Sequence, residues 1–205
     1  WEVTAAGRNY SYKYGYGKLD AGLFVEAART WELVKPQAWF DSPVVKLPLT
    51  EAPVRPTIPQ GDANSNNNQA RSPIEVADTP VEISDTDPGF DIPEVNRGSF
   101  IVRDGVESSF EVTREMLDNE NFETLEHITV RVWIEHQRRG HVEVAIRSPA
   151  GHTSTLALTR NRDVEVTGFD GWKFMSLKHW GEDPVGKWVI NVRDQGSDEF
   201  TGRFN

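Results

Sequence analysis

The fold is set by the stretch ITVRVWIEHQRRGHVEVAIR, residues 128–147. From Ile128 to Ile134 every second residue is a β-branched apolar one, and the same apolar alternation returns from Val142 to Ile146. A period of two is typical of antiparallel strands that bury one face and leave the other in water. The stretch therefore predicts two strands, and the polar residues between them predict that they form a hairpin.

Turn signals and short apolar runs continue on both sides of this stretch. Residues 137–140 form its own turn, and SPAG at residues 148–151 has the composition of a second turn. Short strands separated by turns roughly every 8 to 12 residues are typical of a sandwich or barrel, so we predict a mainly β domain over residues 99–205. Its further strands are expected at residues 100–102, 110–112, 155–158, 172–178 and 188–192.

Large aromatic side chains are concentrated in the second half of this domain. Each ring buries a large apolar area, so a small sandwich needs only a few of them. We expect five to supply much of the bulky packing: Phe169, Trp172, Phe174, Trp180 and Trp188.

Residues 1–35 carry a different pattern. YSYKYGYG at residues 10–17 predicts a short extended segment that ends in a close approach of backbones at its glycines. Asp20 then has the side chain to cap a helix, and apolar residues from Phe24 to Trp31 recur at helical spacing on one face. One short helix cannot form a core, so this apolar face needs a partner, most of which we expect upstream.

Residues 36–98 have the composition of a linker or insertion. They hold ten of the twelve prolines, together with the polar tract at residues 64–69. Proline removes backbone donors, and the asparagine tract has no apolar side chains to bury. We therefore predict a long, mostly disordered linker, with short extended pieces at residues 44–47 and 81–83.

Composition excludes several classes of function. The formal net charge of −10 argues against a nucleic-acid partner, which would need a basic face. The sequence has no cysteine, which excludes disulfides, thiolate metal sites and a cysteine nucleophile. No apolar run approaches a membrane span of about 20 residues, so no membrane contact is expected here. Because the chain starts at Trp1 and shows no signal-peptide pattern, we expect an internal fragment.

The histidines offer little chemistry of their own. None of the five lies in a catalytic motif, and the sequence contains no nucleophile elbow, so we expect surface or strand-edge positions for all of them. A zinc site from His136 and His141 would need a third ligand that the sequence does not identify. The five are His127, His136, His141, His152 and His179.

The acidic pairs at residues 182–183 and 198–199 flank Gly, Pro and Ser, which favours turns over catalysis or calcium binding. No phosphate loop or dinucleotide motif is present. Asn9 begins the sequon Asn9-Tyr10-Ser11, which makes it a candidate N-glycosylation site. Taken alone, the residues predict a non-catalytic β domain tethered to a helix.

Several stretches resemble the kexin and furin family of proprotein convertases. The tryptophan-rich sequence is closer to the fungal kexins than to furin. The matches keep the family order and cover nearly all of residues 1–35 and 99–205. In residues 1–35, which we call the first zone, and directly after it they include YKYGYGKLDA at residues 12–21 and KPQAW at residues 35–39. In the β zone they include LEHITV at 125–130, GFDGWKFMS at 168–176, HWGE at 179–182 and GKW at 186–188.

The resemblance implies a fold and a function. Residues 1–35 would be the end of a subtilisin-like catalytic α/β domain, and residues 99–205 a jelly-roll P domain that packs against it and holds it folded. The complete protein would be a calcium-dependent serine endopeptidase that cleaves secretory precursors after Lys-Arg or Arg-Arg, in the late Golgi membrane. No catalytic residue and no calcium ligand can be carried over to this chain, so we expect it to be inactive alone.

Some features depart from the family pattern. The turn reads RRGH at residues 138–141, where furin-like members have Arg-Gly-Asp, so no integrin-type function is carried over. The linker is longer than the family usually shows, and the family's closing P-domain strand, soon after residue 205, is absent.

Two other functions stay open on the residues alone. One is an independent jelly-roll module that binds a carbohydrate or peptide, which an outward-facing Trp133 would favour. Trp133 could equally pack on a neighbouring domain or under a loop. The other is a structural interaction domain of an unrelated secreted protein, against which the Tyr/Gly stretch at residues 12–21 speaks.

Overall fold

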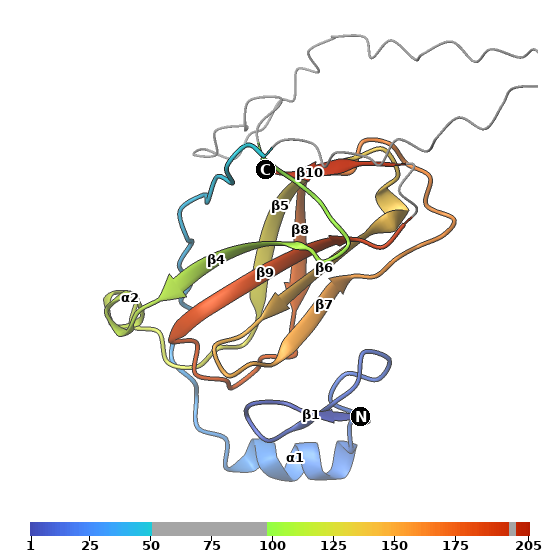
Figure 1. Cartoon of the computed structure of the whole chain (residues 1–205). Helices are drawn as coiled ribbons and strands as arrows, with labels where there is room; N and C mark the ends of the chain where they lie inside the picture. Colours follow the sequence, from blue (N-terminus) through green and yellow to red (C-terminus); the bar gives the residue numbers. More distant parts are fainter. Residues whose placement is uncertain (51–97, 197–199) are drawn as a thin grey trace, which may run out of the picture. The chain divides into compact units, whose positions relative to one another are not determined.

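The second half of the chain is a sandwich of two four-stranded antiparallel sheets (Figure 1). The computed structural model describes residues 1–50, 98–196 and 200–205. The first sheet runs β3 (Ser99–Phe100), β10 (Gly202–Phe204), β5 (Ile128–His136) and β8 (Phe169–Ser176). The second runs β4 (Val106–Val112), β9 (Gly186–Asp194), β6 (Val142–Arg147) and β7 (Thr153–Ala157). The predicted mainly β sandwich is confirmed.

The core lies between the two sheets and is built from the alternating residues of β5 and β6. Val132 and Ile134 of β5 and Val142 and Val144 of β6 are all almost completely buried. Each apolar side chain that leaves water in this way contributes about 1.5–3 kcal/mol. The predicted inward faces of both strands are therefore correct.

The predicted hairpin between β5 and β6 is wrong, because the two strands lie in different sheets. The 3₁₀ turn η1 (Arg139–His141) carries the chain from one sheet to the other. A Cβ atom on Gly140 would collide with the carbonyl oxygens of Arg160 and Asp163, so only glycine fits at this crossing. A period of two is the same whether two strands pair side by side or face each other across a core.

The turn predicted at residues 148–151 is confirmed. It joins β6 to β7, with Ile146 opposite Ser154 in the register. The turn is closed by a hydrogen bond from the Ser148 N–H to the His152 carbonyl at 2.9 Å, and Gly151 takes the left-handed conformation with φ 87°. The other expected strands also form, as β3, β4, β8 and β9, within a few residues of their predicted bounds.

Two elements were not predicted. The short helix α2 (Arg114–Asn119) begins at Thr113, whose hydroxyl accepts a hydrogen bond from the Met116 N–H at 3.3 Å. Strand β10 inserts between β3 and β5, where it pairs with both. It is only three residues long and begins with glycine, so it carries no alternation that could reveal it.

The first 35 residues form a small extended unit and a helix. Strand β1 (Glu2–Val3) pairs with β2 (Asn9–Tyr10), so the predicted extended segment is present but shorter than expected. Helix α1 (Ala21–Arg29) follows, and the predicted cap is confirmed, because the Leu23 N–H donates to Asp20 Oδ1 at 3.0 Å. Trp31 lies beyond the end of this helix.

The linker is only partly described. Residues 44–47 form no strand, contrary to the expected extended piece, although Phe40 and Leu47 pack against the sandwich core. The asparagine tract and residues 81–83 lie outside the described residues. Of the helices in the described part of the chain, none is both long and apolar enough to cross a membrane.

The five aromatic residues divide into two groups. Phe169 and Trp188 are buried as expected, and Phe169 is the largest fully buried side chain among the described residues. Trp172 is 44% exposed, and Phe174 and Trp180 are half-buried. The expectation of a bulky aromatic core thus holds for Phe169 and Trp188, while Phe174 packs against the core from a half-buried position.

Candidate functional site

The tyrosines of the first zone bind the sandwich beside strand β7. Ser11 and Gly15 form a bridge that folds the chain back, with Gly15 in the left-handed conformation (φ 58°). The Tyr16 hydroxyl then donates toward the carbonyls of Leu177 and Lys178, at 2.8 and 3.1 Å. We call this group the tyrosine contact, and its members are Glu2, Tyr10, Tyr12 and Tyr16 on one side and Thr153, Thr155, Leu177 and Lys178 on the other.

Tyr12 covers the free edge of strand β7, which is the last strand of its sheet. Its hydroxyl accepts a hydrogen bond from the Thr155 N–H at 2.9 Å and donates to the Thr153 carbonyl at 3.4 Å. These are backbone groups that a further strand would otherwise pair with. One side chain of the first zone therefore closes part of this edge against association with another chain.

Lys178 places a positive charge inside the same contact. Its side chain is 3% exposed, and Nζ lies 2.8 Å from Glu2 Oε2 and 2.5 Å from the Thr153 carbonyl oxygen. The ammonium group also lies 5.1 Å from the centre of the Tyr12 ring. A buried lysine is tolerated only when its donors are satisfied, and this one has partners on both sides of the contact.

The pKa values of Tyr10 and Tyr16 are raised in this setting. Burial raises the pKa of Tyr10, and the Tyr12 hydroxyl raises it further. Burial also raises the pKa of Tyr16, against the opposing effect of a backbone hydrogen bond. The Tyr10 ring packs edge-to-face on Tyr12 and Tyr16, at centroid distances of 5.6 and 5.3 Å. The three rings therefore form a small apolar cluster in edge-to-face contact.

Two histidines are buried, contrary to the surface positions expected for all five. His179 Nδ1 lies 2.7 Å from Glu182 Oε2, and the His179 ring packs edge-to-face on Trp188 at 5.1 Å. Burial alone raises the pKa of Glu182, but hydrogen bonds from His179 and Ser148 outweigh it and leave the pKa lowered. Glu182 is thus a buried structural partner of a histidine, which the expectation of a turn residue missed.

Asp183, the other member of that pair, does lie in a surface loop. Its carboxylate forms an exposed ion pair with Arg114 at 3.0 Å and accepts from the Val185 N–H at 3.1 Å. The second acidic pair, Asp198 and Glu199, falls outside the described residues.

His136 is the second buried histidine. Its Nε2 lies 3.2 Å from Asp194 Oδ2, across the two sheets, while Nδ1 accepts from the Arg138 N–H at 3.0 Å. The ring of His141 lies 6.2 Å from that of His136, and burial lowers the pKa of His141. Among residues 1–50, 98–196 and 200–205, no three histidine or acidic side chains are grouped so that they could hold a metal ion.

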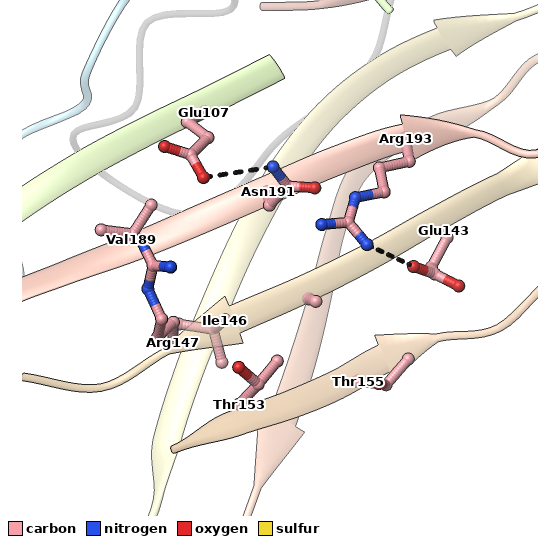
Figure 2. Close-up of a pocket in the computed structure, with 10 residues that line it drawn as sticks. Glu107, Glu143, Ile146, Arg147, Thr153, Thr155, Val189, Asn191 and Arg193 are labelled. Atoms are coloured by element: carbon pink, nitrogen blue, oxygen red, sulfur yellow. Dashed lines mark hydrogen bonds and ion pairs between the residues drawn. The ribbon is translucent and has the colours of Figure 1, made fainter. Parts of the chain in front are cut away.

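A shallow pocket of about 130 Å³ lies on the outer face of the second sheet (Figure 2). Several of its polar side chains bond to one another. Arg193 forms an ion pair with Glu143 at 3.6 Å, and the Asn191 amide donates to Glu107 at 3.3 Å. The described residues that line it include no aromatic side chain, so it lacks the stacking surface typical of a carbohydrate site. It gives no support to an independent binding module.

Trp133, the residue that would favour such a module, is half-buried. The guanidinium of Arg131 lies 6.0 Å from its ring centre, and the backbone at Gly171 also approaches the ring. Asn9, the glycosylation candidate, is an exposed residue of β2. It borders an open cleft that Arg8, Tyr16 and Trp180 also line.

Comparison with known proteins gives a consistent picture. Residues 125–205 match the model of the proprotein convertase P-domain. A dibasic-processing endoprotease of Schizosaccharomyces pombe is 32% identical over the whole chain, which covers 23% of that protein. A kexin of Candida albicans is 36% identical over 94% of the chain and 17% of its own length. Proprotein convertase subtilisin/kexin type 4 of mouse is 30% identical over 96% of the chain and 22% of its own.

The fold has solved relatives as well. A serine protease of Aeromonas sobria, crystallised with its chaperone, matches all of this chain and 31% of its own with a TM-score of 0.55. Its sequence identity is 17%, so it shows the fold alone. The chain spans about a fifth of the length of the curated relatives that it matches.

Proposed function

Because this chain belongs to the kexin-type proprotein convertase family, we propose that it supplies the P domain of a serine endopeptidase that processes secretory precursors after paired basic residues. The reaction would be acyl transfer by a serine triad outside this chain. The role of the chain itself would be to hold the catalytic domain folded. No catalytic residue is assigned to it.

The tyrosine contact is the observation that carries this proposal. It fixes residues 1–17 to the sandwich through Tyr12, Tyr16 and Lys178, although more than a hundred residues separate the two sides. The family resemblance assigns residues 1–35 to the end of the catalytic domain. On this assignment the contact would join the catalytic domain to the P domain, which are each other's proposed partners.

Many large apolar side chains of the first zone are exposed. None of the nine residues of α1 is buried. Burial of apolar surface contributes roughly 25 cal/mol per Å², so a catalytic domain that covered these side chains would gain considerable stability. The exposed large apolar side chains include Trp1, Leu19, Leu23, Phe24, Val25 and Trp31.

The division of the chain follows from this role. We assign residues 1–35 to the end of the catalytic domain, residues 36–98 to a linker or insertion, and residues 99–205 to the P domain. Secretory precursors with Lys-Arg or Arg-Arg would be the substrates, and the late Golgi membrane the place of action. Calcium belongs to the proposal for the full-length enzyme only, because the described residues contain no group of side chains that fits the ion.

A comparison of two proteins tests this function. We expect the purified chain to leave a fluorogenic Lys-Arg peptide uncut and the full-length enzyme to cleave it. We also expect removal of residues 99–205 from the full-length enzyme to lower both its activity and its thermal stability, since the triad itself is untouched. Unchanged activity and stability after this deletion would contradict the supporting role.

A further inference from the structure

The chain contains the kind of peptide bond that its proposed parent enzyme would cut. Arg138-Arg139 is the only pair of adjacent Lys or Arg residues in the sequence, and Gly140 follows it. Cleavage after the pair would separate β5 from β6, which lie in different sheets. The folded domain must therefore protect this bond from hydrolysis if the two strands are to stay covalently joined.

The backbone around the pair has its hydrogen bonds within the domain. The N–H groups of Arg139 and Gly140 donate to the carbonyls of Glu165 and Asp163 at 2.7 and 3.1 Å. The Gly140 carbonyl accepts from the Arg160 N–H at 2.7 Å. The segment itself is the 3₁₀ turn η1. A protease that binds its substrate as an extended strand needs these same groups free.

The two arginine side chains are also engaged. Arg139 forms a two-pronged ion pair with Asp163, with Nε and Nη2 at 2.9 and 3.1 Å from its two oxygens, and lies 5.0 Å from the ring centre of Trp172. These hydrogen bonds hold the pKa of Asp163 well below its usual range. Arg138 donates to the Asn161 carbonyl at 3.0 Å. Neither guanidinium is offered to an acidic subsite.

We infer that the Arg139–Gly140 bond is a latent cleavage site for dibasic-specific serine endopeptidases. The folded η1 turn and the Arg139–Asp163 ion pair protect it from cleavage. Hydrolysis would add one water, leaving a carboxylate on Arg139 and an amine on Gly140. Cleavage by an unrelated dibasic-specific protease does not depend on what this chain does. Cleavage by a second copy of the parent enzyme rests on the proposed function. Molecules whose P domain unfolds around η1 would be cleaved selectively, because the cleavage rate follows the fraction of molecules in the open state.

The test uses the 1–205 chain and a dibasic-specific endoprotease from a separate source, with a Lys-Arg peptide to show that the protease is active. Intact mass reports the fragments 1–139 and 140–205. We expect the native chain to stay uncut while a synthetic peptide of residues 132–146 is cut after Arg139. We expect Asp163→Asn to raise the cleavage rate at least tenfold, and Glu165→Gln, a neighbouring exposed carboxylate that does not bond the Arg139 side chain, to change it less than twofold.

A further variant keeps the result interpretable if Asp163→Asn unfolds the domain. Arg138→Gln removes the dibasic pair, so the double variant Asp163→Asn/Arg138→Gln should resist the protease, although trypsin cuts it. An uncut 132–146 peptide, or native chain cut as fast as that peptide, would overturn the inference. Equal rates for Asp163→Asn and Glu165→Gln would overturn the role of the ion pair. Because the protease is external, none of these outcomes depends on the parent enzyme's own activity.

Discussion

The Nζ atom of Lys178 lies 2.8 Å from the Oε2 atom of Glu2, 176 residues away in the sequence. The lysine side chain is 3% exposed and the glutamate side chain 47% exposed. The pair therefore joins a buried cation of the sandwich to a half-solvated anion of the first zone. The loss of folding stability therefore depends on which of the two partners is removed.

Removal of the anion alone should be the more damaging change. Glu2→Gln leaves the Lys178 charge buried without its carboxylate, and we expect it to lower the free energy of unfolding by about 1–3 kcal/mol. Lys178→Met removes the buried charge as well as the bond, so its cost should be smaller. Urea unfolding of both single variants and the double variant measures the coupling. A coupling energy near zero would show that the pair contributes nothing to the contact.

Tyr12→Phe should loosen the edge of β7. The Thr155 N–H loses the hydrogen bond that it donates to the Tyr12 hydroxyl, which costs about 1 kcal/mol. Amide hydrogen exchange at Thr155 should become faster, and the melting temperature should fall. Tyr14→Phe is the matched control, because Tyr14 is about as exposed as Tyr12 and its ring packs on Trp1. Equal protection of Thr155 in both variants would mean that Tyr12 does not cover this edge.

Asp163 should contribute to acid stability. Its folded-state pKa is lowered, so its contribution is fully present above the unfolded pKa of about 3.9 and is lost as pH falls through the folded value. The stability difference between the native chain and Asp163→Asn should therefore be largest at neutral pH and shrink below about pH 4. It should shrink but persist in an Arg139→Gln background, because Arg160 also donates to Asp163 Oδ2 at 2.8 Å. A difference that grows toward low pH would have the wrong sign for this ion pair.

Asn9 should carry an N-linked glycan when the protein passes through a eukaryotic secretory pathway. The residue begins a sequon and is exposed in β2. We expect treatment with peptide N-glycosidase to increase the electrophoretic mobility of the secreted protein. Asn9→Gln and Ser11→Ala should both remove this shift. An unmodified Asn9 in the peptide map of the secreted protein would contradict the prediction.

The inward faces of the sandwich were predictable because alternation depends only on local sequence. Val132 and Val144 could be recognised as core residues from their own neighbours. Sheet membership could not, because β5 and β6 would show the same pattern whether they paired or faced each other. The crossing at Gly140 depends on Arg160 and Asp163, which lie some twenty residues further on.

The candidate site was less predictable than the fold. The tyrosine run at residues 10–17 was visible, but its partners at Thr153, Thr155 and Lys178 are ordinary surface residue types. The burial of His179 and Glu182 likewise depends on contacts with Trp188 and Ser148 that no local pattern reveals. Only the family resemblance pointed to a contact between the first zone and the sandwich.

The most direct test is thermal inactivation of the full-length enzyme with and without Tyr12→Phe and Glu2→Gln together, followed by hydrolysis of a Lys-Arg peptide. Neither residue is assigned to catalysis, so kcat/KM well below the transition should stay within twofold of the parent value. The temperature of half-inactivation should fall, because the contact loses the Tyr12 hydroxyl bonded to Thr155 and the Glu2 carboxylate bonded to Lys178. An unchanged inactivation temperature would contradict the claim that this contact braces the catalytic domain.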